Sequence, residues 1–97
     1  MTRDEFIQIF DRYDHEFLKK ERVDFTVTKR PDLHAFLLLD RLLPGKRDMI
    51  SASEHDEYFL DIDIDQLVEV ITEADIITLQ RCGVRYDESL DSLAVFA

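Results

Sequence analysis

The chain has little cysteine, proline or glycine: one cysteine, two prolines and two glycines among 97 residues. A single cysteine excludes an intrachain disulfide and suits a reducing compartment. Two glycines exclude a glycine-rich loop that cradles phosphate, and so few chain breakers predict few long loops. The sequence also lacks a signal-peptide pattern and an apolar run long enough to span a membrane. We therefore expect a soluble, cytoplasmic protein.

The residues that are present predict one folded domain. Apolar residues make up 45% of the chain and charged residues 35%, with seven phenylalanines and three tyrosines. This balance is typical of a globular chain, because a disordered chain has too little apolar surface to bury. A chain of this length supports one hydrophobic core, so we expect a single globular domain over residues 1–97.

Basic residues are scarce in the second half of the chain, and the net charge is −10. Residues 1–53 contain ten acids and ten lysines or arginines, whereas residues 54–97 contain twelve acids against Arg81 and Arg85. This asymmetry argues against nucleic acid or an anionic membrane as a direct partner of the second half. It favours a basic protein surface as the partner, or else it serves only solubility.

Two helices are predicted in the first half. Thr2 and Glu5 have the spacing of a capping box, and a stripe of aromatic and aliphatic residues continues that helix over about 3–20. Pro31 suits the first position of a second helix, 31–43, which is apolar on nearly every side. Such a helix is either buried on all sides or covers a second subunit. The second alternative predicts a homo-oligomer contact through Leu37, Leu38 or Leu42.

Two shorter helices are predicted in the second half. Asp63 stands three residues before Gln66, the spacing of a capping box, and begins the first of them. Thr72 begins the second by a similar box. Gly83 is expected at positive φ, where it would end a helix over 73–82.

Alternation of apolar and polar residues predicts the strands between these helices. The predicted strands are 23–28, 49–53, 58–64, 84–86 and 93–96. The second and third are expected to form a hairpin. The element order α-β-α-β-β-α-α-β-β predicts an α+β fold, with a mostly antiparallel sheet of four or five short strands packed against helices.

Aspartates alternate with apolar residues from Leu60 to Asp65. In a strand, one solvent-exposed face would carry Asp61, Asp63 and Asp65, with successive aspartates about 6.6 Å apart along the strand. The alternative to a binding role is a solvated strand face that prevents edge-to-edge aggregation, as half-exposed strands commonly show. The binding hypothesis joins these aspartates with the acids that follow them. The predicted partner-binding acidic face is Asp61, Asp63, Asp65, Glu69, Glu73 and Asp75.

No catalytic or metal-binding motif stands out. The run of aspartates matches the opening of an EF-hand loop, but Gln66 and Thr72 stand where that loop needs glycine and glutamate. Cys82 lies near the C-terminal end of its predicted helix, where a thiolate is not stabilised, so we expect a buried, inert thiol. The three histidines lack the spacing of a zinc site. We therefore expect no metal, no cofactor and no enzymatic activity.

These features favour a small non-enzymatic protein-interaction module. A sharper form of this hypothesis is an acidic inhibitor or decoy of a basic nucleic-acid-binding protein, of the type that phages and toxin–immunity pairs use. A second hypothesis, from a different class, is a structural subunit that forms homo-oligomers through the 31–43 helix, and an enzyme is the third. Binding that weakens at high salt would favour the interaction module. An oligomer that is stable at high salt would favour the structural subunit.

Overall fold

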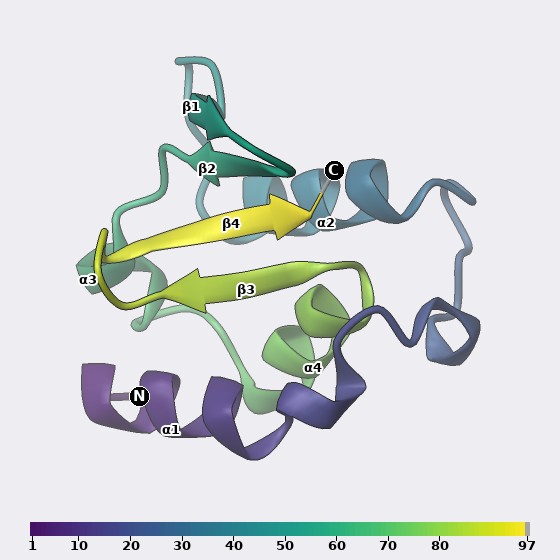
Figure 1. The fold of residues 1–97 in the computed structure, drawn as a ribbon, viewed down its shortest axis with the longest axis horizontal. Helices are drawn as coiled ribbons and strands as arrows, with labels where there is room; N and C mark the ends of the chain where they lie inside the picture. Colours follow the sequence, from purple (N-terminus) through teal and green to yellow (C-terminus); the bar gives the residue numbers. More distant parts are fainter. Residues whose placement is uncertain (97) are drawn as a thin grey trace.

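Four α-helices, two single-turn 3-10 helices and four strands make up the described part of the chain. The computed structural model describes residues 1–96 (Figure 1). In chain order the elements are α1 (Arg3–Arg12), η1 (Asp14–Glu16), η2 (Lys20–Arg22), α2 (Pro31–Leu42), β1 (Ile50–Glu54), β2 (Glu57–Leu60), α3 (Ile64–Leu67), α4 (Glu73–Arg81), β3 (Val84–Asp87) and β4 (Ser92–Phe96). None of the helices among these residues is long and apolar enough to cross a membrane.

The strands form one antiparallel sheet in the order β1-β2-β4-β3, with β4 between β2 and β3. Figure 1 shows α1 and α4 below this sheet and α2 behind β4. Val84, Leu93 and Val95 belong to the core that the sheet forms with the helices. Phe59 and Ala94 are buried outside that core, because successive residues of a strand point to opposite faces. The predicted α+β class, a mostly antiparallel sheet packed against helices, is confirmed.

The core is formed by apolar side chains from the α-helices and from one face of the sheet. The largest fully buried side chains are Phe6, Leu39, Leu67, Ile76, Leu79, Leu93, Val84 and Val95. The Cα radius of gyration is 12.3 Å, and a compact domain of this length has a radius of about 13 Å. The described residues therefore form one compact domain around one core.

Side-chain caps begin two helices where the sequence predicts them. Thr2 accepts a hydrogen bond from the Glu5 backbone N–H at 3.1 Å, and Glu5 accepts one from the Thr2 N–H at 2.9 Å. Thr72 and Asp75 form the same reciprocal pair at 3.2 and 3.0 Å. These bonds satisfy backbone donors that the first turn of a helix leaves without intrahelical partners. Both predicted helix starts are confirmed.

Gly83 follows α4 at positive φ, as predicted. Its φ is +94°, and glycine adopts such a backbone conformation more easily than residues that carry a Cβ. The chain enters β3 at the next residue, and the Gly83 carbonyl accepts a hydrogen bond from the Phe96 N–H at 2.9 Å. This residue therefore turns the chain from the helix layer into the sheet.

The first helix is shorter than the predicted segment 3–20, because α1 ends at Arg12 and two 3-10 turns follow. Glu16, in the first of these turns, is only 6% exposed. Its carboxylate lies 2.8 Å from Arg22 and 3.0 Å from Arg81, and the bond with Arg81 holds the pKa of Glu16 below its usual value. A carboxylate this buried needs cationic partners. The turns after Arg12 bring it to the arginine of α4.

The predicted strand 23–28 is absent, which corrects the predicted element order. Val27 is 78% exposed, whereas Val23 and Phe25 are half-buried and pack against the core. The Phe25 ring lies edge-on to His34, at a centroid distance of 5.2 Å. An alternating pattern forms a strand only where a neighbouring strand supplies hydrogen-bond partners, and this segment pairs with none of β1 to β4.

Candidate functional site

The aspartates of the predicted acidic face do not form a ladder on a strand. β2 ends at Leu60, so the predicted strand 58–64 is wrong beyond that residue. Asp63 accepts hydrogen bonds from the Asp65 and Gln66 N–H groups at 2.9 and 3.3 Å. It is thereby the N-cap of α3. Capping prevails over the alternating pattern because it satisfies backbone donors at the helix start.

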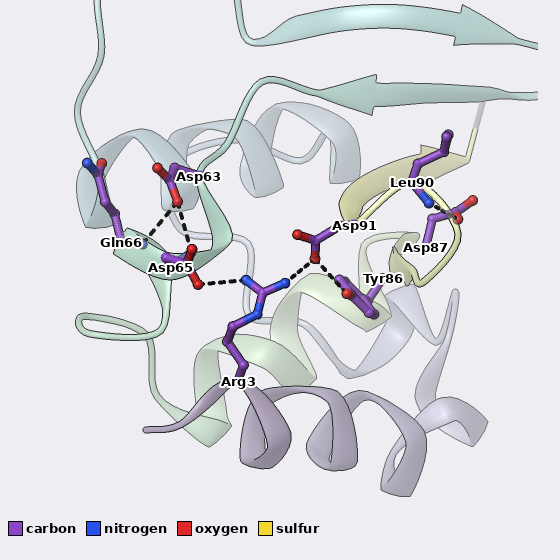
Figure 2. Close-up of polar contacts among 8 residues, drawn as sticks. All are labelled: Arg3, Asp63, Asp65, Gln66, Tyr86, Asp87, Leu90 and Asp91. Carbon is purple, nitrogen blue, oxygen red and sulfur yellow. Dashed lines mark hydrogen bonds and ion pairs between the residues drawn. The ribbon is translucent and has the colours of Figure 1, made fainter.

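Arg3 connects α1 with α3 and with the turn between β3 and β4 (Figure 2). Its Nη1 atom lies 2.9 Å from Asp65, and its Nη2 atom contacts Asp91. Asp91 also accepts a hydrogen bond from the Tyr86 hydroxyl at 2.7 Å. The bonds from Tyr86 and Arg3 hold the pKa of Asp91 below its usual value, while burial and Asp91 raise the pKa of Tyr86 to about 12. Asp65 is therefore already engaged by an arginine of its own chain.

Arginines from the first half of the chain also pair with two further acids of the predicted face. Arg47 lies 2.9 Å from Asp61, and Arg12 lies 3.3 Å from Glu73. These pairs are exposed, so each contributes little to stability. The pairs do change the surface charge. They bring arginines of the first half of the chain beside acids of the second half, and so partly cancel the charge asymmetry of the sequence.

The predicted acidic face is divided in the structure. Asp61 and Asp63 line a groove of about 670 Å³ together with Asp91, which pairs with Arg3, but Lys46 and Arg47 line it as well. Its negative charge is therefore largely balanced. The remaining acids lie outside this groove, on α3, on the loop that follows it and at the start of α4. They are Asp65, Glu69, Glu73 and Asp75.

A second hollow, of about 640 Å³, lies on the sheet face that points away from the core, and we call it the acidic hollow. Its residues come from the segment after α1, the β1–β2 hairpin, β3, the β3–β4 turn and the end of β4. They are Phe17, Glu54, His55, Asp56, Glu57, Phe59, Arg85, Asp87, Ser89, Leu90 and Phe96.

The acidic hollow contains apolar side chains that are open to solvent. Leu90 is 56% exposed and Phe96 is 49% exposed. Phe59 also lines the hollow but is buried, outside the main core. Apolar side chains gathered on one exposed surface are a feature of interaction sites. The acidic hollow therefore holds exposed apolar side chains beside the charged groups described next.

Arg85 organises two of the four carboxylates in the acidic hollow. It donates to Glu57 at 2.5 and 2.6 Å and to Asp87 at 3.1 Å. The bonds to Glu57 raise the pKa of Arg85 above its usual value. The Ser89 hydroxyl and Arg85 both donate to Asp87 and hold the pKa of that carboxyl low. These two acids are therefore fixed in position by Arg85.

Glu54 and Asp56 add two carboxylates that have no arginine or lysine partner among residues 1–96. Glu54 lies directly opposite Glu57 across the hairpin, and like charges in that position destabilise a sheet. The Nε2 atom of His55 lies 3.6 Å from the Glu54 carboxylate. Four carboxylates against the one guanidinium of Arg85 leave a surplus of three negative charges in the acidic hollow.

None of the residues predicted from the sequence to bind a partner lies in the acidic hollow. Its charged residues lie on segments that are distant in sequence and meet only because β4 lies between β2 and β3. One local signal was available. Arg85 is one of only two cations in residues 54–97 and stands two residues before Asp87, on the same face of a strand.

The three leucines predicted to contact a second copy have different environments. Leu37 is 43% exposed, and Leu42 is half-buried. Leu38 is 5% exposed and packs in the core of its own chain. Of the three, Leu37 is therefore the residue most open to a second copy.

Residues 1–96 contain no group of three or more His, Cys, Asp or Glu side chains arranged to hold a metal ion. The aspartates that match the start of an EF-hand loop have other partners, since Asp63 caps α3 and Asp61 pairs with Arg47. Cys82 is buried, and burial raises the pKa of its thiol to about 11.

Cys82 is expected to react slowly with a thiol reagent while the protein is folded. Its pKa of about 11 compares with 9.0 for an ordinary thiol, so the thiolate fraction at neutral pH falls by about a hundredfold. Labelling of native and urea-unfolded protein, followed at pH 7 and pH 8, measures the difference. Equal rates in the two states would show that the thiol is accessible and reactive, and would reopen a nucleophilic role.

Comparison with known proteins gives no match: no family model, no curated protein and no solved structure matches this chain.

Proposed function

We propose that this protein is a small, acidic, non-enzymatic interaction module whose acidic hollow binds a basic segment of another protein. One observation carries the proposal: exposed apolar side chains and a surplus of three negative charges occur in the same hollow. Lysine and arginine side chains combine an apolar stem with a cationic head. Such a side chain would place its stem against Phe96 or Leu90 and its head beside Glu54 or Asp56.

The net charge of −10 supports the same assignment at longer range. A negative surface raises the rate at which a basic partner arrives, and salt screens this attraction over about 8 Å at physiological ionic strength. A partner of this kind would also bind nucleic acid, which suggests the finer proposal of an inhibitor or decoy. The single free cysteine is consistent with a cytoplasmic setting.

The predicted acidic face remains a rival location for the same function. Its acids are less suited to it, because Asp61, Asp65 and Glu73 are paired with arginines of this chain. A partner would have to displace those arginines before it could use the carboxylates. Glu54 and Asp56 require no such displacement.

The two locations are distinguished by two matched double variants. E54Q/D56N and D61N/D63N each remove two negative charges and keep the side-chain shapes. At low salt, the rate of association with an extended lysine- and arginine-rich peptide should fall about three- to tenfold in E54Q/D56N and much less in D61N/D63N. Stopped-flow or surface-based kinetics at two salt concentrations measure both rates.

A pull-down at low and high salt would identify the natural partner, and competition with nucleic acid would test the decoy form. Equal association rates for E54Q/D56N and the wild type would remove the acidic hollow from consideration. A larger effect of D61N/D63N would transfer the function to the face predicted from the sequence. Equal rates for all three proteins at both salts would leave the charge with a solubility role only.

A further inference from the structure

The solvent-facing side of α2 carries an apolar stripe with opposite charges at its two ends. Leu33 is 40% exposed and Leu37 is 43% exposed, although both belong to a helix that contributes to the core. Arg30 precedes the stripe and Asp40 follows it, and both are exposed. Within residues 1–96, neither of these charged side chains forms an ion pair.

The spacing of the residues within α2 places them on one line along the helix. Leu33, Leu37 and Asp40 follow one another at intervals of four and three residues, which is the spacing of a helix–helix seam, and Arg30 is the N-cap residue three positions before Leu33. The core-facing residues are Ala35, Leu38 and Leu39. At about 100° per residue, Leu37 lies about 200° from Ala35, so the stripe points away from the core.

The stripe is complementary to itself when a second copy runs in the opposite direction. A two-fold axis through the middle of the stripe brings Leu33 of one copy to Leu37 of the other. The same axis brings Arg30 of one copy to Asp40 of the other. Each contact then occurs twice, as in every interface with two-fold symmetry. A parallel arrangement would place Arg30 against Arg30 and Asp40 against Asp40.

We propose that the protein forms a two-fold symmetric dimer in which the α2 stripes of two copies pack antiparallel. The charge pattern selects a second copy as the occupant, because it matches its own reverse. The interface is small, so the dimer forms in the high micromolar range and exchanges with monomer. It uses α2 and leaves the sheet face with the acidic hollow free. The dimer and the proposed function can therefore be tested independently of each other.

Sedimentation equilibrium tests the dimer on the full chain, from low micromolar concentrations to about 1 mM. The mass of the wild type should rise towards twice the chain mass of 11.5 kDa. L37Q should weaken association about tenfold or more. The matched control is V70Q, which changes an exposed apolar residue on the turn after α3, outside both α2 and the acidic hollow, and should associate like the wild type.

Charge reversal tests the antiparallel register. R30D and D40R should each weaken the dimer about tenfold, because each turns two attractive pairs into repulsive ones. The double variant R30D/D40R exchanges the two charges and should restore wild-type association. Both substitutions suit the helix ends electrostatically, so circular dichroism should show folded proteins throughout.

A wild type that remains monomeric over the whole range would overturn the proposal. So would equal association of L37Q and the wild type, since the stripe would then not form the interface. If V70Q weakened association to the same extent as L37Q, the contact would lie elsewhere. If R30D/D40R associated more weakly than either single variant, the antiparallel register would be excluded.

Discussion

Replacing Phe6 with alanine should lower the free energy of unfolding by about 3–5 kcal/mol. Phe6 is 0% exposed, so its removal leaves a cavity that the surrounding side chains fill only in part. Its ring packs edge-on against Phe10 and Tyr86, at centroid distances of 5.0 and 5.7 Å. A domain of this size has a total stability of about 5–15 kcal/mol. The loss would therefore leave a marginally folded protein.

Urea unfolding followed by circular dichroism measures this loss, provided that the dependence on denaturant stays similar between variants. F6L retains most of the buried volume and should lose about 1 kcal/mol. L90A removes an exposed side chain and should change stability by no more than about 0.5 kcal/mol. A loss below 1 kcal/mol in F6A would contradict the packing of α1 against β3.

G83A should lower the free energy of unfolding by about 2 kcal/mol. Two effects contribute. The φ of +94° strains any residue that has a Cβ, and a Cβ at this position would lie 2.9 Å from the Cδ2 atom of Leu18. The main chain of Leu18 is held by a hydrogen bond from its N–H to the Gln80 carbonyl at 3.0 Å, but its half-buried side chain can rotate. Backbone strain is therefore the larger of the two effects.

The other glycine of the chain supplies the matched control. A Cβ at Gly45 meets no atom within 4 Å, so G45A should change the free energy of unfolding by no more than about 0.5 kcal/mol. The double variant L18A/G83A removes the clash but keeps the backbone strain, so its loss should be smaller than the sum of the two single losses. Similar stabilities of G83A and G45A would show that neither the strain nor the contact is present.

Signals that are local in the sequence predicted their elements correctly. The capping boxes at Thr2 and Thr72, the helix start at Pro31 and the positive φ of Gly83 all depend on residues within one turn of each other. The hairpin of β1 and β2 was predicted for the same reason, since two short alternating runs flank a polar turn. Such features need no knowledge of the rest of the chain.

Features that depend on distant residues could not be predicted. The early end of α1 at Arg12 accompanies the pairing of Glu16 with Arg81, 65 residues away in sequence. The segment 23–28 has the alternation of a strand but no strand beside it. In the acidic face, local alternation competed with a local cap at Asp63, and the cap prevailed.

The acidic hollow depends on the order of the strands, which no local pattern reveals. Glu57 and Arg85 are 28 residues apart in sequence and meet across β4. The charge map of the sequence correctly located the excess of acid in residues 54–97. It could not show which of those acids are neutralised by arginines from the first half.

The location of the basic partner on the surface can be measured directly. Backbone amide NMR spectra of the ¹⁵N-labelled protein, titrated with the lysine- and arginine-rich peptide at low salt, report which residues the peptide contacts. The proposed function predicts that the largest shifts occur at Glu54, Asp56, Arg85 and Phe96 and that they diminish as salt is added. Shifts concentrated in residues 61–75, or spread evenly over the surface, would contradict a binding site in the acidic hollow.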